Sequence, residues 1–198
     1  MQYPKVFENL IEDFKKLPGV GEKTAERYAF VINSLSNDDI ENFSNNLLEF
    51  KKNIKKCKQC GILTDKDICE ICASKARNNS IICVVEDSKN AYIFEKSGNF
   101  NGKYHVLNGL INPIEDVNPE DINIYSLINN RVNDDVKEVI IALSPSIEGE
   151  TTSLYIQKLL EKKNIKVSRL SYGIPMGSDI EYLDPIMISK ALEDRKYI

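Results

Sequence analysis

The sequence predicts a mixed α+β protein built from several small parts. Apolar residues recur at helical spacing over the first 56 residues, four cysteines then fall within sixteen residues, and from residue 80 short apolar runs alternate with helical segments. The 198 residues can bury a real core but fit only one or two domains of ordinary size. We expect a helix-hairpin-helix bundle, a small cysteine module, an α/β layer with a mostly parallel sheet and a helical C-terminal tail, over residues 1–56, 57–78, 79–172 and 173–198 respectively.

The sequence of residues 1–56 predicts two helices joined by a hairpin, followed by a third helix. Apolar residues at helical spacing run over residues 7–17, stop at Pro18-Gly19 and resume over residues 25–32. The third helix carries one apolar stripe, which consists of Ile40, Phe43, Leu47, Phe50 and Ile54.

The hairpin is a candidate phosphate-binding site. Its Gly-Val-Gly turn, from Gly19 to Gly21, leaves backbone N–H groups unpaired at the start of the second helix, so this helix N-terminus can accept a phosphate oxygen. Lys23 and Arg27 lie four residues apart, hence on one helix face, and would add two cationic contacts. Such a site contacts the phosphates of DNA and not its bases. The alternative is a simple tight turn between two packed helices.

Positive charge is local in this chain. The formal net charge is −4, yet residues 1–60 hold ten Lys and Arg against nine Asp and Glu, and the remainder holds sixteen against twenty-one. Five lysines fall within eight residues at the end of the third helix: Lys51, Lys52, Lys55, Lys56 and Lys58. Such a run is usually a solvated face, but here it adjoins the hairpin and the cysteines. We expect moderate, salt-sensitive DNA binding that depends on several copies acting together.

The four clustered cysteines predict one structural zinc ion per chain. An odd total of five cysteines argues against a disulfide framework. A Cys-x-x-Cys pair can turn both thiolates toward one ion, and two pairs complete a tetrahedron with no open position for substrate water. The expected ligands are Cys57, Cys60, Cys69 and Cys72. The alternatives are unligated cysteines and a redox dithiol.

The surroundings of these cysteines suggest a small knuckle. Gly61 suits a turn that lets backbone amides approach the sulfurs, and the polar segment "ILTDKDI" between the pairs suggests a loop that projects into water. The fifth cysteine, Cys83, lies in the apolar run "SIICVVE", which predicts ordinary core packing.

The region from residue 80 predicts alternating strands and helices around a mostly parallel sheet. Strands are expected at "SIICVVED", "YHVL", "KEVIIALSPS" and "IKVSRLSYG", and helices at "SKNAYIFEKSG", "PEDINIYSLINNRV" and "EGETTSLYIQKLLEKKN". In such sheets, function gathers at the carboxyl ends of the strands. The acids expected at those ends are Glu86, Asp87, Glu148 and Glu150.

Together these parts resemble the RecR family of recombination mediators. The resemblance covers nearly the whole chain and follows one order, namely a helix-hairpin-helix motif in "LPGVGEKTAERYAF", a four-cysteine zinc finger, a Toprim domain in "CVVED" and "ALSPSIEGETTSLYI", and a C-terminal tail in "YGIPMGSDIEYLDPIMISKALEDRK". It implies a non-enzymatic DNA-binding clamp or adaptor in recombinational repair, which acts with RecO and RecF to help load RecA on single-stranded DNA. It further implies a homo-oligomer, a dimer or ring-like tetramer, that binds duplex and single-strand or junction DNA.

The Toprim resemblance leaves an enzymatic alternative. Catalysis in such domains needs a glutamate and an Asp-x-Asp pair that holds Mg²⁺. Glu86 fills the glutamate position, but Ser144-Pro145-Ser146 stands where the aspartates would be. Glu148 and Glu150 could hold Mg²⁺ weakly, or could simply complement a helix N-terminus. The alternative function is therefore a Mg²⁺-dependent phosphoryl-transfer enzyme, nuclease or primase-like, and otherwise the acids are a partner-contact site.

The remaining features point to ordinary structural roles or to location. His105, the only histidine, lies in a strand-like run and suits a core or edge position better than a ligand role. The tail acids Asp179, Glu181 and Asp184 fit a basic partner or an acidic loop and helix cap equally well. With no signal-peptide pattern and no apolar run of membrane-spanning length, we expect a cytoplasmic, nucleoid-associated protein that does not enter the membrane.

Overall fold

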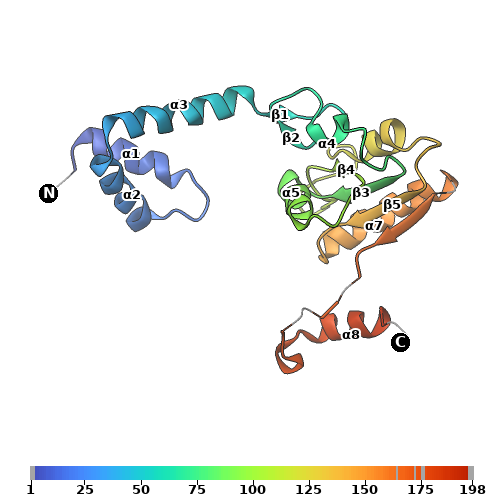
Figure 1. Cartoon of the computed structure of the whole chain (residues 1–198). Helices are drawn as coiled ribbons and strands as arrows, with labels where there is room; N and C mark the ends of the chain where they lie inside the picture. The colour runs from blue at the N-terminus through green and yellow to red at the C-terminus, as the bar shows by residue number, and fades with distance from the viewer. Residues whose placement is uncertain (1–2, 164, 172, 175–176, 196–198) are drawn as a thin grey trace. The chain divides into compact units, whose positions relative to one another are not determined.

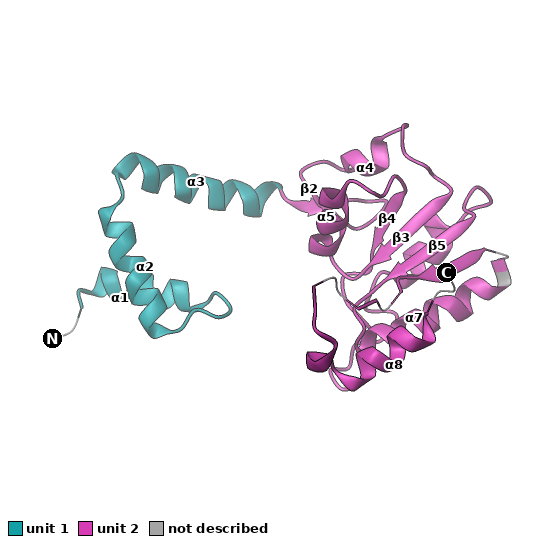
Figure 2. Ribbon diagram, turned by 60° about the horizontal axis from the view of Figure 1, so that its bottom comes forward, with its two compact units in different colours: residues 1–53 teal, residues 54–198 magenta. Residues whose placement is uncertain are grey.

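The chain forms two compact units, residues 1–53 and residues 54–198 (Figure 2). The structure is a computed structural model, and it describes residues 3–163, 165–171, 173–174 and 177–195. Residue 172, at which the sequence sets the end of the α/β part, lies outside these ranges. The first unit contains the helices α1 Lys5–Lys15, α2 Glu22–Ser34 and α3 Asn37–Asn53 (Figure 1).

Helices α1 and α2 form the core of the first unit. Ile11 of α1 packs with Ala25 and Ala29 of α2, and all three are at most 3% exposed. The alanines lie four residues apart, so one face of α2 carries small side chains and α1 can approach closely. Lys15 joins the two helices through an ion pair with Glu22 at 2.7 Å.

Helix α3 forms at the expected position, but its apolar stripe covers no core. None of the residues of α3, all of which are described, is buried. Phe43, Leu47 and Phe50 are 47%, 56% and 61% exposed. An apolar stripe normally faces a core. The sequence pattern therefore predicts a buried face, whereas in the structure this face of α3 is exposed.

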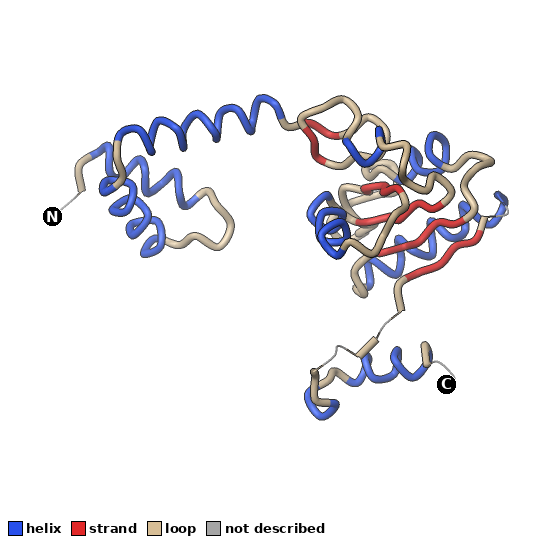
Figure 3. The backbone as a smooth tube through the Cα atoms, viewed as in Figure 1, coloured by secondary structure: helices blue, strands red, loops and turns tan. Residues whose placement is uncertain are grey.

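The second unit is a parallel α/β fold with a short hairpin and the cysteine module before it. Its sheet has the order β4-β3-β5-β6 with every neighbouring pair parallel, which confirms the predicted sheet (Figure 3). The elements in chain order are β1 Lys55–Lys56, β2 Leu63–Thr64, α4 Glu70–Ala73, β3 Ile81–Val85, α5 Ser88–Ser97, β4 Lys103–Val106, α6 Ile124–Ser126, the π-helix η1 Leu127–Arg131, β5 Glu138–Ala142, α7 Ile147–Leu160, the 3-10 helix η2 Glu161–Lys163, β6 Lys166–Arg169, the 3-10 helix η3 Ile180–Tyr182 and α8 Pro185–Glu193.

The two faces of the sheet have different covers. Side chains alternate along a strand, so Ile82 and Val84 of β3 enter one apolar cluster, together with residues of α7 and of the segment 107–136. Cys83 and Val85 enter a second cluster, together with three of the four module cysteines and Ala91 of α5. Cys83 is 3% exposed, in agreement with the predicted core packing.

One local prediction was wrong, and another holds only in part. Residues 65–67, in the loop between the two cysteine pairs, are exposed as expected, but Ile62 is 1% exposed and packs in the same cluster as the sheet. The expected helix over residues 119–132 is shorter and irregular: it begins at Ile124 and continues as the π-helical turn η1. Residues 119–123 form turns instead, and there the Asn118 N–H bonds to the Asp121 side chain at 2.9 Å.

The C-terminal tail contains η3 and α8. Asp184 caps α8 by accepting a hydrogen bond from the Ile186 N–H at 2.7 Å, and Pro185 occupies the first helical turn. Of the two roles open to this acid, it therefore fills that of a helix cap. Within the ranges that the structure describes, no helix is long and apolar enough to cross a membrane.

Candidate metal centre and nucleic-acid interface

The four module cysteines converge on one point. The Sγ atoms of Cys57, Cys60, Cys69 and Cys72 all lie within 4.8 Å of one another, and those of Cys60 and Cys69 are 3.6 Å apart. Tetrahedral zinc with Zn–S bonds of about 2.3 Å requires sulfurs roughly 3.8 Å apart. The donor set is soft, closed and mostly buried, so the site fits a structural zinc ion.

Local backbone bonds bring each pair into position. The Cys57 N–H donates to the Ile62 carbonyl at 2.7 Å, and the Gly61 N–H returns to the Cys57 carbonyl at 2.9 Å. This tight turn needs the left-handed φ of +78° that Gly61 adopts. In the second pair, Cys69 caps α4, and its sulfur accepts the Cys72 N–H at 3.4 Å.

The thiols strongly influence one another. Hydrogen bonding between them raises the pKa of Cys60 and lowers the pKa of Cys69. In addition, the Cys69 N–H donates to the Cys57 sulfur at 3.3 Å, as expected for a sulfur that carries negative charge. Four thiolates at such separations repel one another, and a bound cation removes that repulsion.

The module contacts the sheet through Cys60 and Gly61. The Cys60 carbonyl accepts the Val106 N–H at 2.7 Å, which extends edge strand β4 toward the module. A Cβ on Gly61 would lie 2.9 Å from the Val106 carbonyl oxygen and 3.0 Å from the Asn123 side-chain amide. The zinc module and the loop after β4 are therefore in close contact at Gly61.

The predicted hairpin residues lie together in the first unit. Gly19 has φ +77°, and Gly21 is the extended N-cap of α2, with no side chain to cap the first N–H groups of the helix. Lys23 and Arg27 are exposed, and within the described part of the chain neither forms an ion pair. The Arg27 guanidinium lies over the ring of Tyr28, 5.7 Å from its centroid. The hairpin therefore presents unpaired N–H groups and two free cations on one side.

The lysine run beyond the hairpin is partly neutralised. Asp67 forms ion pairs with Lys55 and, at 2.8 Å, with Lys58. These lysines lower the pKa of the Asp67 carboxyl to about 2. Two of the five lysines thus help to close the zinc module.

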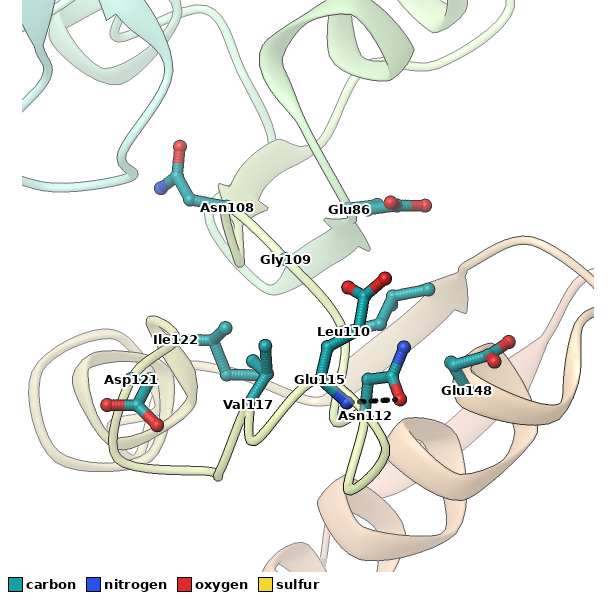
Figure 4. A pocket seen from close by; sticks show the side chains of 10 residues that line it. All are labelled: Glu86, Asn108, Gly109, Leu110, Asn112, Glu115, Val117, Asp121, Ile122 and Glu148. Atoms are coloured by element: carbon teal, nitrogen blue, oxygen red, sulfur yellow. Dashed lines mark hydrogen bonds between the residues drawn. The ribbon is translucent and has the colours of Figure 1, made fainter.

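The four predicted acids separate into two pairs. Glu86 and Glu148 line a pocket of about 540 Å³ at the carboxyl edge of the sheet, with Glu115 and Asp121 from the loop after β4 (Figure 4). Asp87 instead caps α5, and Glu150 is paired with Arg169 at 2.9 Å.

The acids of this pocket are spread out. Glu86 accepts a hydrogen bond from the Ser144 hydroxyl at 3.4 Å, and hydrogen bonds from its own backbone N–H and the Ser146 hydroxyl lower the pKa of Glu148. Among the described residues, only the cysteines bring three or more metal-ligating side chains close enough to share an ion. Sequence reasoning missed Glu115 and Asp121, because their position depends on the path of a long loop.

His105 is a buried residue of the edge strand. It is fully buried, and its Nε2 lies 2.7 Å from the Asn123 carbonyl oxygen, to which it donates. Burial lowers the pKa of His105 to about 4, so the ring is neutral at pH 7.

Four family models match the chain in a single order. They are described as RecR, helix-hairpin-helix, over residues 7–50; RecR, zinc finger domain of the four-cysteine type, over residues 54–74; Toprim domain, over residues 80–171; and RecR, C-terminal, over residues 173–196. The fold and the closed thiolate site therefore define a zinc-finger protein with a Toprim domain and a DNA-binding type of helical hairpin.

The chain belongs to the RecR family. Its domains support a role in recombinational DNA repair, and its zinc-finger match and clustered cysteines support one structural zinc ion.

Proposed function

We propose that this protein is a non-enzymatic DNA-binding clamp or adaptor of recombinational repair, which acts with RecO and RecF to help load RecA on single-stranded DNA. The observation that carries DNA binding is the hairpin of Gly19, Gly21, Lys23 and Arg27, whose cations are free of ion pairs in the described residues. Two cations and the open helix N-terminus contact roughly two to four phosphates per chain. Such binding follows the DNA backbone and not its sequence, and it brings the protein to the nucleoid.

Assembly into a dimer or ring-like tetramer is the second half of the proposal. Weak contacts from single chains add up when several hairpins face a common opening. The exposed stripe of α3, with Phe43, Leu47 and Phe50, supports self-association because large apolar side chains in one row favour a partner over water. Light scattering with and without DNA measures the number of chains, and a strictly monomeric protein contradicts the clamp.

The hairpin is tested by Lys23→Ala with Arg27→Ala. We expect this variant to lose DNA binding at about 100 mM salt, with unchanged zinc content and oligomer size. The matched control is Lys51→Ala with Lys52→Ala, which removes the same charge from the end of α3. Wild-type affinity of the hairpin variant across a salt titration, with loss in the control, would transfer the DNA site to the lysine run.

Two different roles are open to the acidic pocket. Its four carboxylates, with Glu86 at the Toprim glutamate position, favour contact with a basic protein surface, and RecO is the first partner to test. The Toprim fold and Glu86 support the alternative, a Mg²⁺-dependent phosphoryl-transfer enzyme of nuclease or primase type. Ser144-Pro145-Ser146 supplies no carboxylate at the metal-binding position, which favours the adaptor.

A further inference from the structure

Two cations beside the cysteine centre have no carboxylate partner. Lys103 begins edge strand β4 and is 5% exposed, and Arg131 ends the π-helical turn η1 and is half-buried. In the ranges that the structure describes, neither side chain forms an ion pair. Burial of an unpaired charge is costly, so negative charge of another kind is expected nearby.

Lys103 holds the helix that carries the second cysteine pair. Its Nζ donates to the carbonyl oxygens of Ile71, Cys72 and Ser74 at 2.6, 3.1 and 2.8 Å. Three acceptors require three N–H donors, which the ammonium has and the neutral amine lacks. These carbonyls lie at the end of α4, which begins just after Cys69. Lys103 therefore fixes the end of α4 and brings a positive charge to it.

Arg131 brings a second positive charge from a different element. Its Nη2 donates to the Tyr104 carbonyl at 3.3 Å, and its buried Nε has no hydrogen-bond partner among the described residues. Tyr104 directly follows Lys103 in β4, so the guanidinium lies against the same edge strand that holds the end of α4. The π-helical turn, closed by the Val132 N–H to the Leu127 carbonyl at 3.0 Å, determines the position of this guanidinium.

The charge of the loaded site matches these two cations. A Zn²⁺ ion with four thiolates retains roughly two net negative charges, which need compensation where water is excluded. Arg77, another cation of this unit, instead forms an ion pair with Glu95. We infer that Lys103 and Arg131 are the counter-ions of the zinc–tetrathiolate centre, and that Lys103 also positions Cys72 through the carbonyls of α4.

The inference is tested on the zinc-loaded full chain with Lys103→Met and Arg131→Gln. Each variant should release zinc to a colorimetric chelator faster than wild type, by roughly 10- to 100-fold for Lys103→Met. The Co²⁺-substituted variants should show a sulfur-to-cobalt charge-transfer band at lower energy, because uncompensated thiolates donate more readily. Lys103→Arg retains the charge and should restore much of the slow release.

The matched control is Lys163→Met. Lys163 also donates from Nζ to helix-end carbonyls, those of Ile128 at 2.8 Å and Val132 at 3.4 Å, but it belongs to η2. Because these carbonyls belong to the turn that carries Arg131, this control should lose stability and should lower the energy of the charge-transfer band no further than Arg131→Gln does. If Lys103→Met lowers stability as the control does, with wild-type zinc release and band energy, the counter-ion role is refuted. If Lys103→Met does not fold, Arg131→Gln provides the test because it leaves the α4 carbonyl bonds intact. Zinc release and band energy equal to those of wild type in Arg131→Gln would then contradict the inference.

Discussion

The cysteine centre and the acidic pocket lie in the same unit but are built in opposite ways. The four sulfurs lie within 4.8 Å of one another in a largely buried cluster. The pocket acids come from a strand end, a loop and a helix, and two of the four predicted acids are engaged elsewhere, in a cap and an ion pair. A converged, closed set of ligands serves folding, whereas dispersed, accessible carboxylates suit contact with another molecule.

Among the variants that test this difference between the two regions, we expect the removal of one cysteine ligand to have the largest effect. Cys60→Ala should lower zinc content well below one equivalent per chain and strongly destabilise the fold, because metal binding and folding of the module are coupled. Zinc analysis and denaturant unfolding measure both.

Cys83→Ala is the matched control for Cys60→Ala. It removes an equally buried sulfur that belongs to β3 and not to the four-cysteine metal site. It should retain a full equivalent of zinc and lose only about 1–2 kcal/mol. Less than half an equivalent in the wild-type protein, with Cys60→Ala as stable as wild type, would refute the structural metal.

Alanine substitution at two glycines tests how closely each of the two regions is packed. A Cβ on Gly149, in the first turn of α7, would lie 1.9 Å from the Ser144 carbonyl oxygen, and one on Gly61 would lie 2.9 Å from the Val106 carbonyl oxygen. We expect Gly149→Ala to cost about 3 kcal/mol and Gly61→Ala about 2 kcal/mol of unfolding free energy.

The control for the glycines is Gly98→Ala. Gly98 has φ +69° but no atom near the added Cβ, so only the backbone strain of about 1 kcal/mol applies. Thermal unfolding in the presence of zinc measures all three variants. Equal losses at the three positions would mean that close packing does not distinguish these turns.

The buried histidine gives the smaller, pH-dependent effect. The folded-state pKa of His105 is about 4, below its ordinary 6.5, so its contribution to stability is complete above pH 6.5 and is lost as the pH falls toward 4. Burial is the main cause, and the nearby positive charge of Arg131 adds to it. The shift predicts a loss of about 2 kcal/mol between pH 7 and pH 5.

His105→Gln isolates this term, since glutamine can still donate to the Asn123 carbonyl but does not titrate. Urea unfolding at several pH values should show a flatter pH dependence for the variant. Parallel curves for the two proteins would assign the acid sensitivity to other groups.

The sequence was sufficient where the geometry is local. Two Cys-x-x-Cys pairs and a Gly after Pro18 predict a metal site and a hairpin from neighbouring residues alone, and the alternation of apolar runs with helical segments predicts a parallel sheet. The closing of α5 at Gly98, with φ +69°, follows from the same kind of signal.

The sequence was insufficient where distant segments meet. The polar loop of the zinc module did not reveal that Ile62 packs in the same cluster as the sheet, nor did the run after Pro119 reveal a π-helical turn. Glu115 and Asp121 reach the pocket only through tertiary packing of their loop. Likewise, the stripe of α3 predicts an apolar face but does not say what covers it.

Incubation with supercoiled plasmid in Mg²⁺ or Mn²⁺ tests most directly whether this is a DNA-binding adaptor without chemistry at the sheet edge. The account predicts retarded plasmid on a gel before deproteination, and fully supercoiled plasmid afterwards, for both wild type and Glu86→Ala. Nicked circles that form with wild type and disappear with Glu86→Ala would contradict it and establish the phosphoryl-transfer alternative.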